Sequence, residues 1–278
     1  MHLSDFYAPT ADDVGILAMV TYFFISVAAY CFLGNLIFSL ATHSSVAPEH
    51  RTSRVFEAII AAVAGLSYFL ILSYYHSMLE DLAKLGSEDE RRDLIRRSYN
   101  SIGQYRYMDW AVTTPLLLLK MVGTLKIKPR EASRAIATLL LADFSMVLNG
   151  YIGEQQLTAG GEIIVGRKLL WGAISTVGYV LIPLVLYQLW KQFGERAVPA
   201  ERRAFKWMGL TTVTTWGVYP IGYLLTMTNL NLNWIHISFT VADIVNKVGV
   251  AAVTYLATKY LIEERLNEKA VLLGHQIS

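Results

Sequence analysis

The sequence predicts an all-α membrane protein, a seven-transmembrane-helix bundle. Apolar residues make up 54% of the 278-residue chain and charged residues only 17%, whereas soluble domains contain about 25% charged residues. Largely uncharged runs recur along the whole chain, each near the roughly 20 residues that a helix needs to cross ~30 Å of hydrocarbon. Because backbone polar groups in lipid must be satisfied within their own segment, we expect each run to be a helix.

The runs follow one another at short intervals, so residues 1–278 are expected to form a single domain. The longest connection, residues 82–104, carries basic and acidic side chains in similar numbers. In it, Ser87 precedes Glu90 by three positions, a capping-box spacing that predicts a short surface helix. The predicted spans, in order, are residues 14–40, 55–75, 105–123, 135–153, 169–189, 207–227 and 234–262.

Basic residues concentrate in alternate connections, which predicts the orientation of the chain. The first, third and fifth connections are rich in lysine and arginine, whereas the fourth has only Arg167 and Lys168 and the sixth has neither. The positive-inside rule places the odd connections and a tail from about residue 263 in the cytoplasm, and the N-terminus outside the cell membrane. The net charge of +2, without a basic tract, argues against a nucleic-acid partner.

Ionisable residues inside the spans are the candidates for function, because a charge at that depth costs at least ~2.5–3.5 kcal/mol. Asp243 and Lys247 are four residues apart and share one face of the last span. Lys120 lies eleven residues beyond Asp109, on the same face and ~16 Å further along the helix axis. Such charges can also simply hold helices together, and a lone Asp–Lys pair favours neither interpretation. The candidates are Arg106, Asp109, Lys120, Asp143, Asp243 and Lys247.

Four local motifs resemble those of microbial rhodopsins, in the same order and on the corresponding spans. The third span contains QYRYMDWAVTTPLLLLK, the fifth WGAIST, the sixth WGVYPIGY and the last FTVADIVNKVG. The resemblance extends over essentially the whole chain. It implies a heptahelical photoreceptor that binds retinal, in the all-trans form in the dark, and that is not an enzyme.

The resemblance also assigns roles to individual residues. Lys247 corresponds to the lysine that forms the protonated Schiff base, while Asp109 and Asp243 correspond to its counterions, with Asp109 the proton acceptor. Arg106 matches the arginine that stabilises both carboxylates, and Thr113 is expected to hydrogen-bond Asp109. Each pocket residue taken singly would be ordinary core packing. The retinal-binding positions are Trp110, Thr114, Leu117, Met146, Gly150, Trp171, Gly172, Ser175, Thr176, Trp216, Tyr219, Pro220 and Tyr223.

Lys120 occupies the position at which bacteriorhodopsin-like proton pumps have a carboxylate donor, and some proton-pumping members resemble this chain in having lysine there. The resemblance therefore predicts a light-driven outward proton pump with acceptor Asp109 and donor Lys120. The alternatives are a photosensory rhodopsin that signals to a partner and a light-gated ion channel. For Lys120 itself, the alternative is a side chain that snorkels to the cytoplasmic headgroups. Glu57, near the cytoplasmic end of the second span, is expected at the interface.

Gly172 follows Trp171 where bacteriorhodopsin has a second tryptophan, and this resembles the opening beside which xanthorhodopsin-like pumps hold a carotenoid. The alternative is that glycine permits close helix packing. The sixth connection has no acidic residue, so the paired glutamates of the extracellular proton-release group look incomplete. His236, at the start of the last span, is an alternative release group. The expected partners are protons, the lipid bilayer and further copies of the chain in a homo-oligomer.

Overall fold

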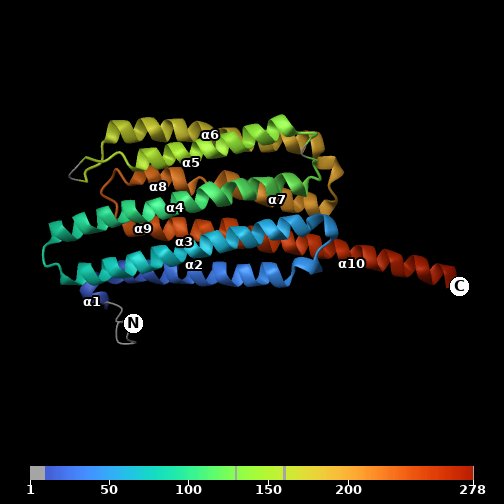
Figure 1. The fold of residues 1–278 in the computed structure, drawn as a ribbon, viewed down its shortest axis with the longest axis horizontal. Helices are drawn as coiled ribbons and strands as arrows, with labels where there is room; N and C mark the ends of the chain where they lie inside the picture. Colours follow the sequence, from blue (N-terminus) through green and yellow to red (C-terminus); the bar gives the residue numbers. More distant parts are fainter. Residues whose placement is uncertain (1–9, 129, 159–160, 278) are drawn as a thin grey trace.

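The computed structural model describes residues 10–128, 130–158 and 161–277, with side chains up to Glu263. Over these residues the chain is nearly all helical, and the helices run side by side as an elongated bundle (Figure 1). Extended pairing in this part of the chain is limited to one isolated bridge between Leu157 and Ile163. The predicted all-α fold is confirmed.

Seven helical rods can be followed through the described residues. The first five are single helices, preceded by the short α1 (Ala11–Val14), while the sixth consists of α7 and α8 and the seventh of α9, a π-helical turn η5 and α10. Their bounds are α2 Ile16–Ala41, α3 Arg51–Lys84, α4 Glu88–Thr124, α5 Ser133–Glu154, α6 Val165–Phe193, α7 Pro199–Thr214, α8 Val218–Leu225, α9 Leu232–Ile244, η5 Val245–Gly249 and α10 Val250–Ile277.

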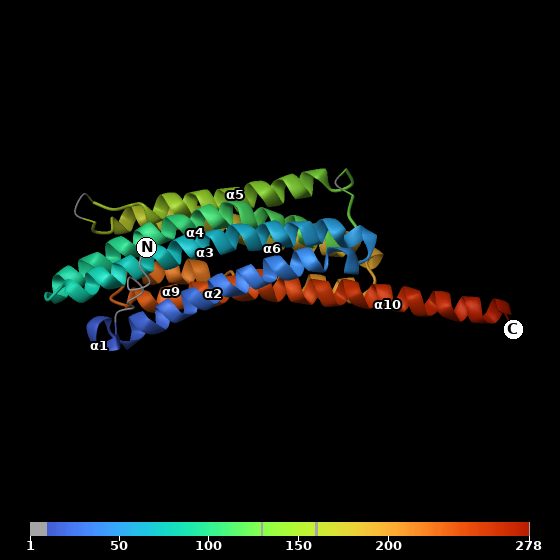
Figure 2. The same cartoon turned by 60° about the horizontal axis from the view of Figure 1, so that its bottom comes forward.

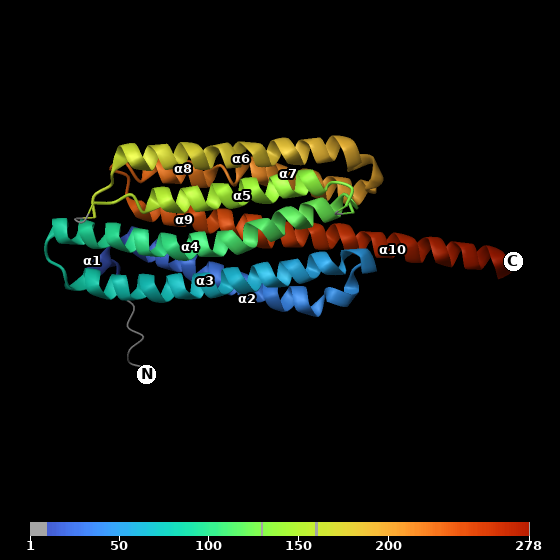
Figure 3. The same ribbon diagram turned by 45° about the horizontal axis from the view of Figure 1, so that its top comes forward.

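The rods close into a ring. Each of α2 to α6 packs against the next, α6 also contacts α7 and α8, and α10 contacts α7 while α9 contacts α2. The end of α10 extends beyond the other helices (Figures 2 and 3). Large apolar side chains such as Phe23, Leu141 and Leu256 are exposed on the outside, as expected for a surface that faces lipid.

Five of the rods are long and apolar enough to cross a membrane by length and composition alone. The third rod, α4, differs because it carries Arg106, Asp109 and Lys120 in its buried part. The sixth is interrupted at residues 215–217, shortly before Pro220, whose ring nitrogen cannot donate the hydrogen bond that a continuous helix requires. Both exceptions lie where the sequence places functional residues.

The charged second connection is shorter than predicted. Instead of a surface helix within residues 82–104, α3 continues to Lys84 and α4 begins at Glu88. The reason is amphipathicity, because Leu94 and Ile95 pack against the apolar cluster between α2, α3 and α4 while most charged side chains of residues 88–97 are exposed. Ser87 is the N-cap residue of α4, but its side chain makes no capping hydrogen bond.

Candidate functional site

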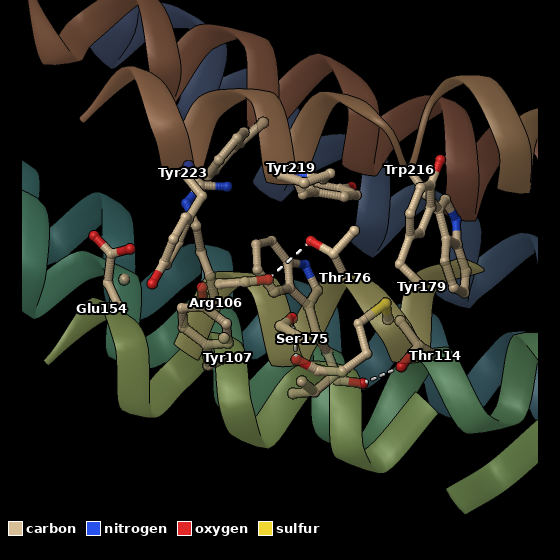
Figure 4. Close-up of a pocket in the computed structure, with 18 of the residues that line it drawn as sticks. Arg106, Tyr107, Thr114, Glu154, Ser175, Thr176, Tyr179, Trp216, Tyr219 and Tyr223 are labelled. Carbon is tan, nitrogen blue, oxygen red and sulfur yellow. Dashed lines mark hydrogen bonds between the residues drawn. The ribbon is translucent and has the colours of Figure 1, made fainter. Parts of the chain in front are cut away.

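A cavity of about 280 Å³ lies inside the bundle, slightly below the roughly 300–1,000 Å³ typical of ligand pockets. Helices α4, α5, α6, α8 and α9 form its walls, and Lys247 in η5 is the lysine that lines it. Figure 4 shows Tyr219 and Trp216 on one side of the cavity and Tyr107 and Thr114 on the other. The predicted pocket residues that line it are Trp110, Thr114, Leu117, Met146, Gly150, Gly172, Ser175, Thr176, Trp216, Tyr219, Pro220 and Tyr223.

The amine of Lys247 lies between two buried carboxylates. Its Nζ is in contact with Asp109 and lies 3.5 Å from Oδ1 of Asp243, and all three side chains are at most 2% exposed. Asp109 comes from α4, whereas Asp243 is on the same rod as Lys247, one helical turn earlier. A buried cation next to two acidic groups is compensated, which avoids the large cost of an unpaired buried charge.

The two carboxylates differ in their other partners. Asp243 accepts hydrogen bonds from Tyr68, Tyr219 and the Trp110 indole at 2.6–3.2 Å. One oxygen of Asp109 faces Lys247, and the other, Oδ1, is buried without a hydrogen-bond partner among the described residues. Protonation would cost Asp243 a set of well-placed donors but would cost Asp109 only its contact with Lys247. Asp109 is therefore the better placed of the two to receive a proton.

Two of the expected contacts around these acids are different in the structure. Thr113 does hydrogen-bond Asp109, but its hydroxyl donates to the backbone carbonyl at 3.0 Å, the usual i−4 bond of a threonine within a helix. Arg106 was expected to stabilise both carboxylates, yet its described ion pair is to Asp243, at 3.7 Å. It also donates to the Tyr68 hydroxyl at 2.9 Å, so tyrosine and arginine together hold Asp243 in place.

Lys120 lies on the same helix as Asp109, nearer to the C-terminal end of α4. Its side chain is fully buried, and its Nζ lies 2.5 Å from Oε1 of Glu57 on α3. The snorkelling interpretation of Lys120 requires an ammonium that reaches out of the bundle, and this buried pair contradicts it. Glu57, which was expected to be interfacial, is likewise buried inside the bundle. Both charges can be buried because each supplies the partner of opposite charge that the other needs.

Comparison with known proteins decides the family. The family model described as "Bacteriorhodopsin-like protein" matches residues 18–261. The chain belongs to the bacteriorhodopsin-like family. Among curated members, it is 28% identical over 220 residues to bacteriorhodopsin of Halobacterium salinarum, covering 78% of this chain and 75% of that protein. It is 34% identical over 150 residues to bacteriorhodopsin-I of Haloquadratum walsbyi and 29% identical over 154 residues to a green-light absorbing proteorhodopsin of a gamma-proteobacterium.

These last two matches span little more than half of either protein: 52% of this chain in both cases, with 54% and 56% of the relatives. Solved structures agree on the fold. Xanthorhodopsin superposes with a TM-score of 0.73 at 24% identity, covering 90% of this chain and 96% of that one. The rhodopsin of Exiguobacterium sibiricum gives 0.71 at 24% identity, with 88% and 98% covered. The bundle is thus that of the bacteriorhodopsin-like family.

The family resemblance assigned two neighbouring residues of α6 to the pocket, and of these Gly172 lines the cavity whereas Trp171 does not. Trp171 lies against Gly153 of α5, where an added Cβ would come within 3.0 Å of the tryptophan Cβ. At Gly172 a Cβ would lie 2.6 Å from the ring of Tyr223, so glycine makes room for that ring. This contact supports the interpretation of Gly172 as a residue that permits close packing.

The end of this bacteriorhodopsin-like bundle at which α5 connects to α6 contains a buried ion pair that the sequence did not reveal. Lys168 Nζ lies 3.2 Å from Oε1 of Glu154, and both side chains are at most 4% exposed. Lys168 was assigned to the fourth connection and Glu154 received no role, because each is at the end of an apolar run. Glu154 also lines the cavity, as does His236, which is buried against the rings of Tyr75 and Tyr99.

Asp143 on α5 is buried and accepts a hydrogen bond from the Thr114 hydroxyl at 2.9 Å. This bond joins α4 to α5 beside the cavity. Asp143 is thus a buried acid that holds two helices together, and it has no described contact with Lys247, Asp109 or Lys120.

Proposed function

We propose that this protein is a light-driven outward proton pump that carries retinal on Lys247. The observation that supports it best is the arrangement on α4. Asp109 contacts the Lys247 amine with one oxygen, and its second oxygen has no donor in the part of the chain that the structure describes. Lys120 is buried eleven residues further along the same helix. An acceptor and a donor therefore lie on opposite sides of the Lys247 nitrogen along one helix face.

The cavity fits a long apolar ligand attached at Lys247. Its lining is mostly aromatic and aliphatic, and the Lys247 amine lies beside Asp109 and Asp243. Trp110, Trp216 and Tyr219 would pack against the ligand. When bound, retinal supplies light absorption and a light-driven change in the position of the proton at the Lys247 nitrogen.

The residues of the chain then determine the direction of proton movement. Asp109 takes the proton from the Lys247 nitrogen, while Asp243 stays ionised because Tyr68, Tyr219 and Trp110 donate to it. Lys120 returns a proton to the Lys247 nitrogen from the opposite side. Its Nζ lies 3.5 Å from the carbonyl of Val250, three residues after Lys247 on the last rod.

The relatives support transport as the general activity. The solved xanthorhodopsin structure is described as that of a light-driven ion pump with a dual chromophore. We infer the same orientation for this chain as the charged loops predict, with the N-terminus outside the cell membrane and the C-terminus in the cytoplasm. We also propose that the protein forms a homo-oligomer in the lipid bilayer. A carotenoid held beside the opening at Gly172 would contact that residue.

The test is the external pH of illuminated cells that express the protein with retinal supplied. A pump acidifies the medium in the light, and a protonophore abolishes the signal. Cells expressing Lys247→Ala are the matched control, because they lack the attachment site. If the wild-type protein binds retinal but external pH does not change, the photosensory alternative takes its place. If light produces a passive flux that follows the imposed gradient, the channel alternative is correct.

A further inference from the structure

Three charged side chains meet in the cytoplasmic half of the bundle, outside the cavity. Arg54 and Glu57 come from α3 and Lys120 from α4, and each residue is about 2% exposed. Glu57 shares its two oxygens between the cations, with Lys120 at 2.5 Å from Oε1 and Arg54 in contact with Oε2. The Thr254 hydroxyl of α10 also donates to Oε1, at 2.6 Å.

The other contacts of this cluster are with backbone carbonyls, hydroxyls and an aromatic ring. On α10, the Val250 carbonyl faces Lys120, and the ring of Tyr255 lies 5.1 Å from the guanidinium of Arg54. On α2, Arg54 donates to the Phe38 carbonyl at 3.2 Å and contacts the Thr42 hydroxyl. Thr42 is only half-buried, so the cluster reaches from the donor lysine towards the end of α2.

The charge balance of the cluster depends on the proton of Lys120. Arg54 and Glu57 neutralise each other, so the cluster carries one positive charge when Lys120 is an ammonium and none when it is an amine. Without Arg54, loss of the Lys120 proton would leave Glu57 as an uncompensated buried anion. Without Glu57, the ammonium would face Arg54 with no anion between them. Either defect is costly in a buried site.

We propose that Glu57 and Arg54 are positioning residues that set how tightly Lys120 holds its proton. Glu57 keeps Lys120 protonated before the flash, and Arg54 allows Lys120 to release its proton afterwards. This rests on the proposed function of Lys120 as donor. It extends that function to a unit of three residues from two helices. Glu57 confines the lysine amine to the core, and Arg54 keeps the carboxylate compensated after the proton has left.

The test is flash photolysis of purified full-length protein with retinal, following return of the proton to the Lys247 nitrogen between about pH 6 and 9. The variants are Lys120→Met, Glu57→Gln and Arg54→Gln, with Glu263→Gln as the matched control because Glu263 is exposed on α10. Glu57→Gln should empty the donor before the flash. Proton return then slows by roughly tenfold or more and follows the proton concentration of the medium, as in Lys120→Met.

Arg54→Gln should differ from Glu57→Gln in the pH dependence of proton return. Lys120 and Glu57 then form an isolated pair that holds the proton more tightly, so return is slower than in the wild type but nearly independent of pH. An unchanged dark absorption maximum in each variant would show that the pocket is intact. The ¹⁵N signal of the Lys120 amine, recorded without illumination, gives an independent measurement, since Glu57→Gln should shift its titration to lower pH.

The outcomes separate this inference from the function on which it rests. If Lys120→Met itself returns the proton at the wild-type rate at every pH, the donor function fails. If Lys120→Met is slow and pH-dependent but Glu57→Gln behaves like the wild type, the donor function stands and the role of Glu57 is overturned. A pH-dependent Arg54→Gln would overturn the role of Arg54, because it would mean that arginine loads the donor.

Discussion

Replacement of Asp109 by asparagine tests the assignment of the proton acceptor. Asparagine keeps the shape of the side chain but removes its charge. The Lys247 amine then depends on Asp243, which is 3.5 Å away and already interacts with Arg106 at 3.7 Å and with the donors Tyr68, Tyr219 and Trp110. Asp243 is therefore a weaker counterion for Lys247 than Asp109.

The magnitude follows from the geometry. A unit charge at ~3 Å in a medium of effective dielectric constant ~20 contributes roughly 5 kcal/mol. Since one pH unit corresponds to about 1.4 kcal/mol, loss of Asp109 should lower the pH at which the Lys247 nitrogen releases its proton in the dark by roughly three to four units. At a pH where the proton is retained, the absorption band should shift to the red.

The assay combines a spectrophotometric pH titration in the dark with the light-driven pH change of expressing cells. Asp109→Asn should titrate at lower pH and should not pump. Asp143→Asn is the matched control, because Asp143 is also a buried acid beside the cavity but is bonded to Thr114. It should titrate and pump like the wild type. Continued outward pumping by Asp109→Asn would refute the assignment and make Asp243 the acceptor.

Three further predictions concern other parts of the molecule. Lys247→Ala should show no visible absorption band with excess retinal, because no other lysine lines the cavity among the described residues; a retained band would place the attachment elsewhere. If a hydroxylated carotenoid binds beside Gly172, the carotenoid bands should appear in the excitation spectrum of the wild type and be absent from that of Gly172→Trp. If the wild-type spectrum lacks these bands, the role of Gly172 is to make room for Tyr223. Glu201 lies outside the predicted membrane spans, and burial by itself would raise its pKa. Hydrogen bonds from His50, the Val198 amide and Lys126 outweigh burial and hold the pKa of Glu201 below its usual value. The ionised Glu201 carboxylate therefore stabilises the fold above the ordinary glutamate pKa of about 4.3, and this contribution is lost as pH falls. Thermal unfolding followed by circular dichroism should show Glu201→Gln lowering the melting temperature at pH 7 by roughly 2–4 °C, with a smaller difference near pH 3.

Local sequence was sufficient for much of the fold. The apolar runs predicted the seven rods, because a span in lipid must satisfy its own backbone and thus reveals itself by length and hydropathy. The structure has α5 at Ser133–Glu154 where residues 135–153 were predicted, and α2 at Ile16–Ala41 where 14–40 were predicted. The error at residues 82–104 arose because the amphipathic ends of α3 and α4 look like a charged loop when hydropathy alone is considered.

Residues on the same rod could also be related by spacing. Asp243 and Lys247 are four apart, and Asp109 and Lys120 eleven apart, so helical periodicity alone places each pair on one face. The motifs around them then indicated the family, which the family model confirmed. These inferences need only positions along one helix.

Contacts between helices were decided by the tertiary structure. Glu57 and Lys120 are 63 positions apart in sequence, and Glu154 belongs to the rod before Lys168, so neither pair has a local signature. Whether two such charges meet depends on how each helix is rotated and shifted against its neighbour, which side-chain packing sets. The same packing gives three donors to Asp243 while leaving an oxygen of Asp109 bare. The sequence thus determined which acids and lysines lie within the helical rods, and helix packing determined which of them are in contact.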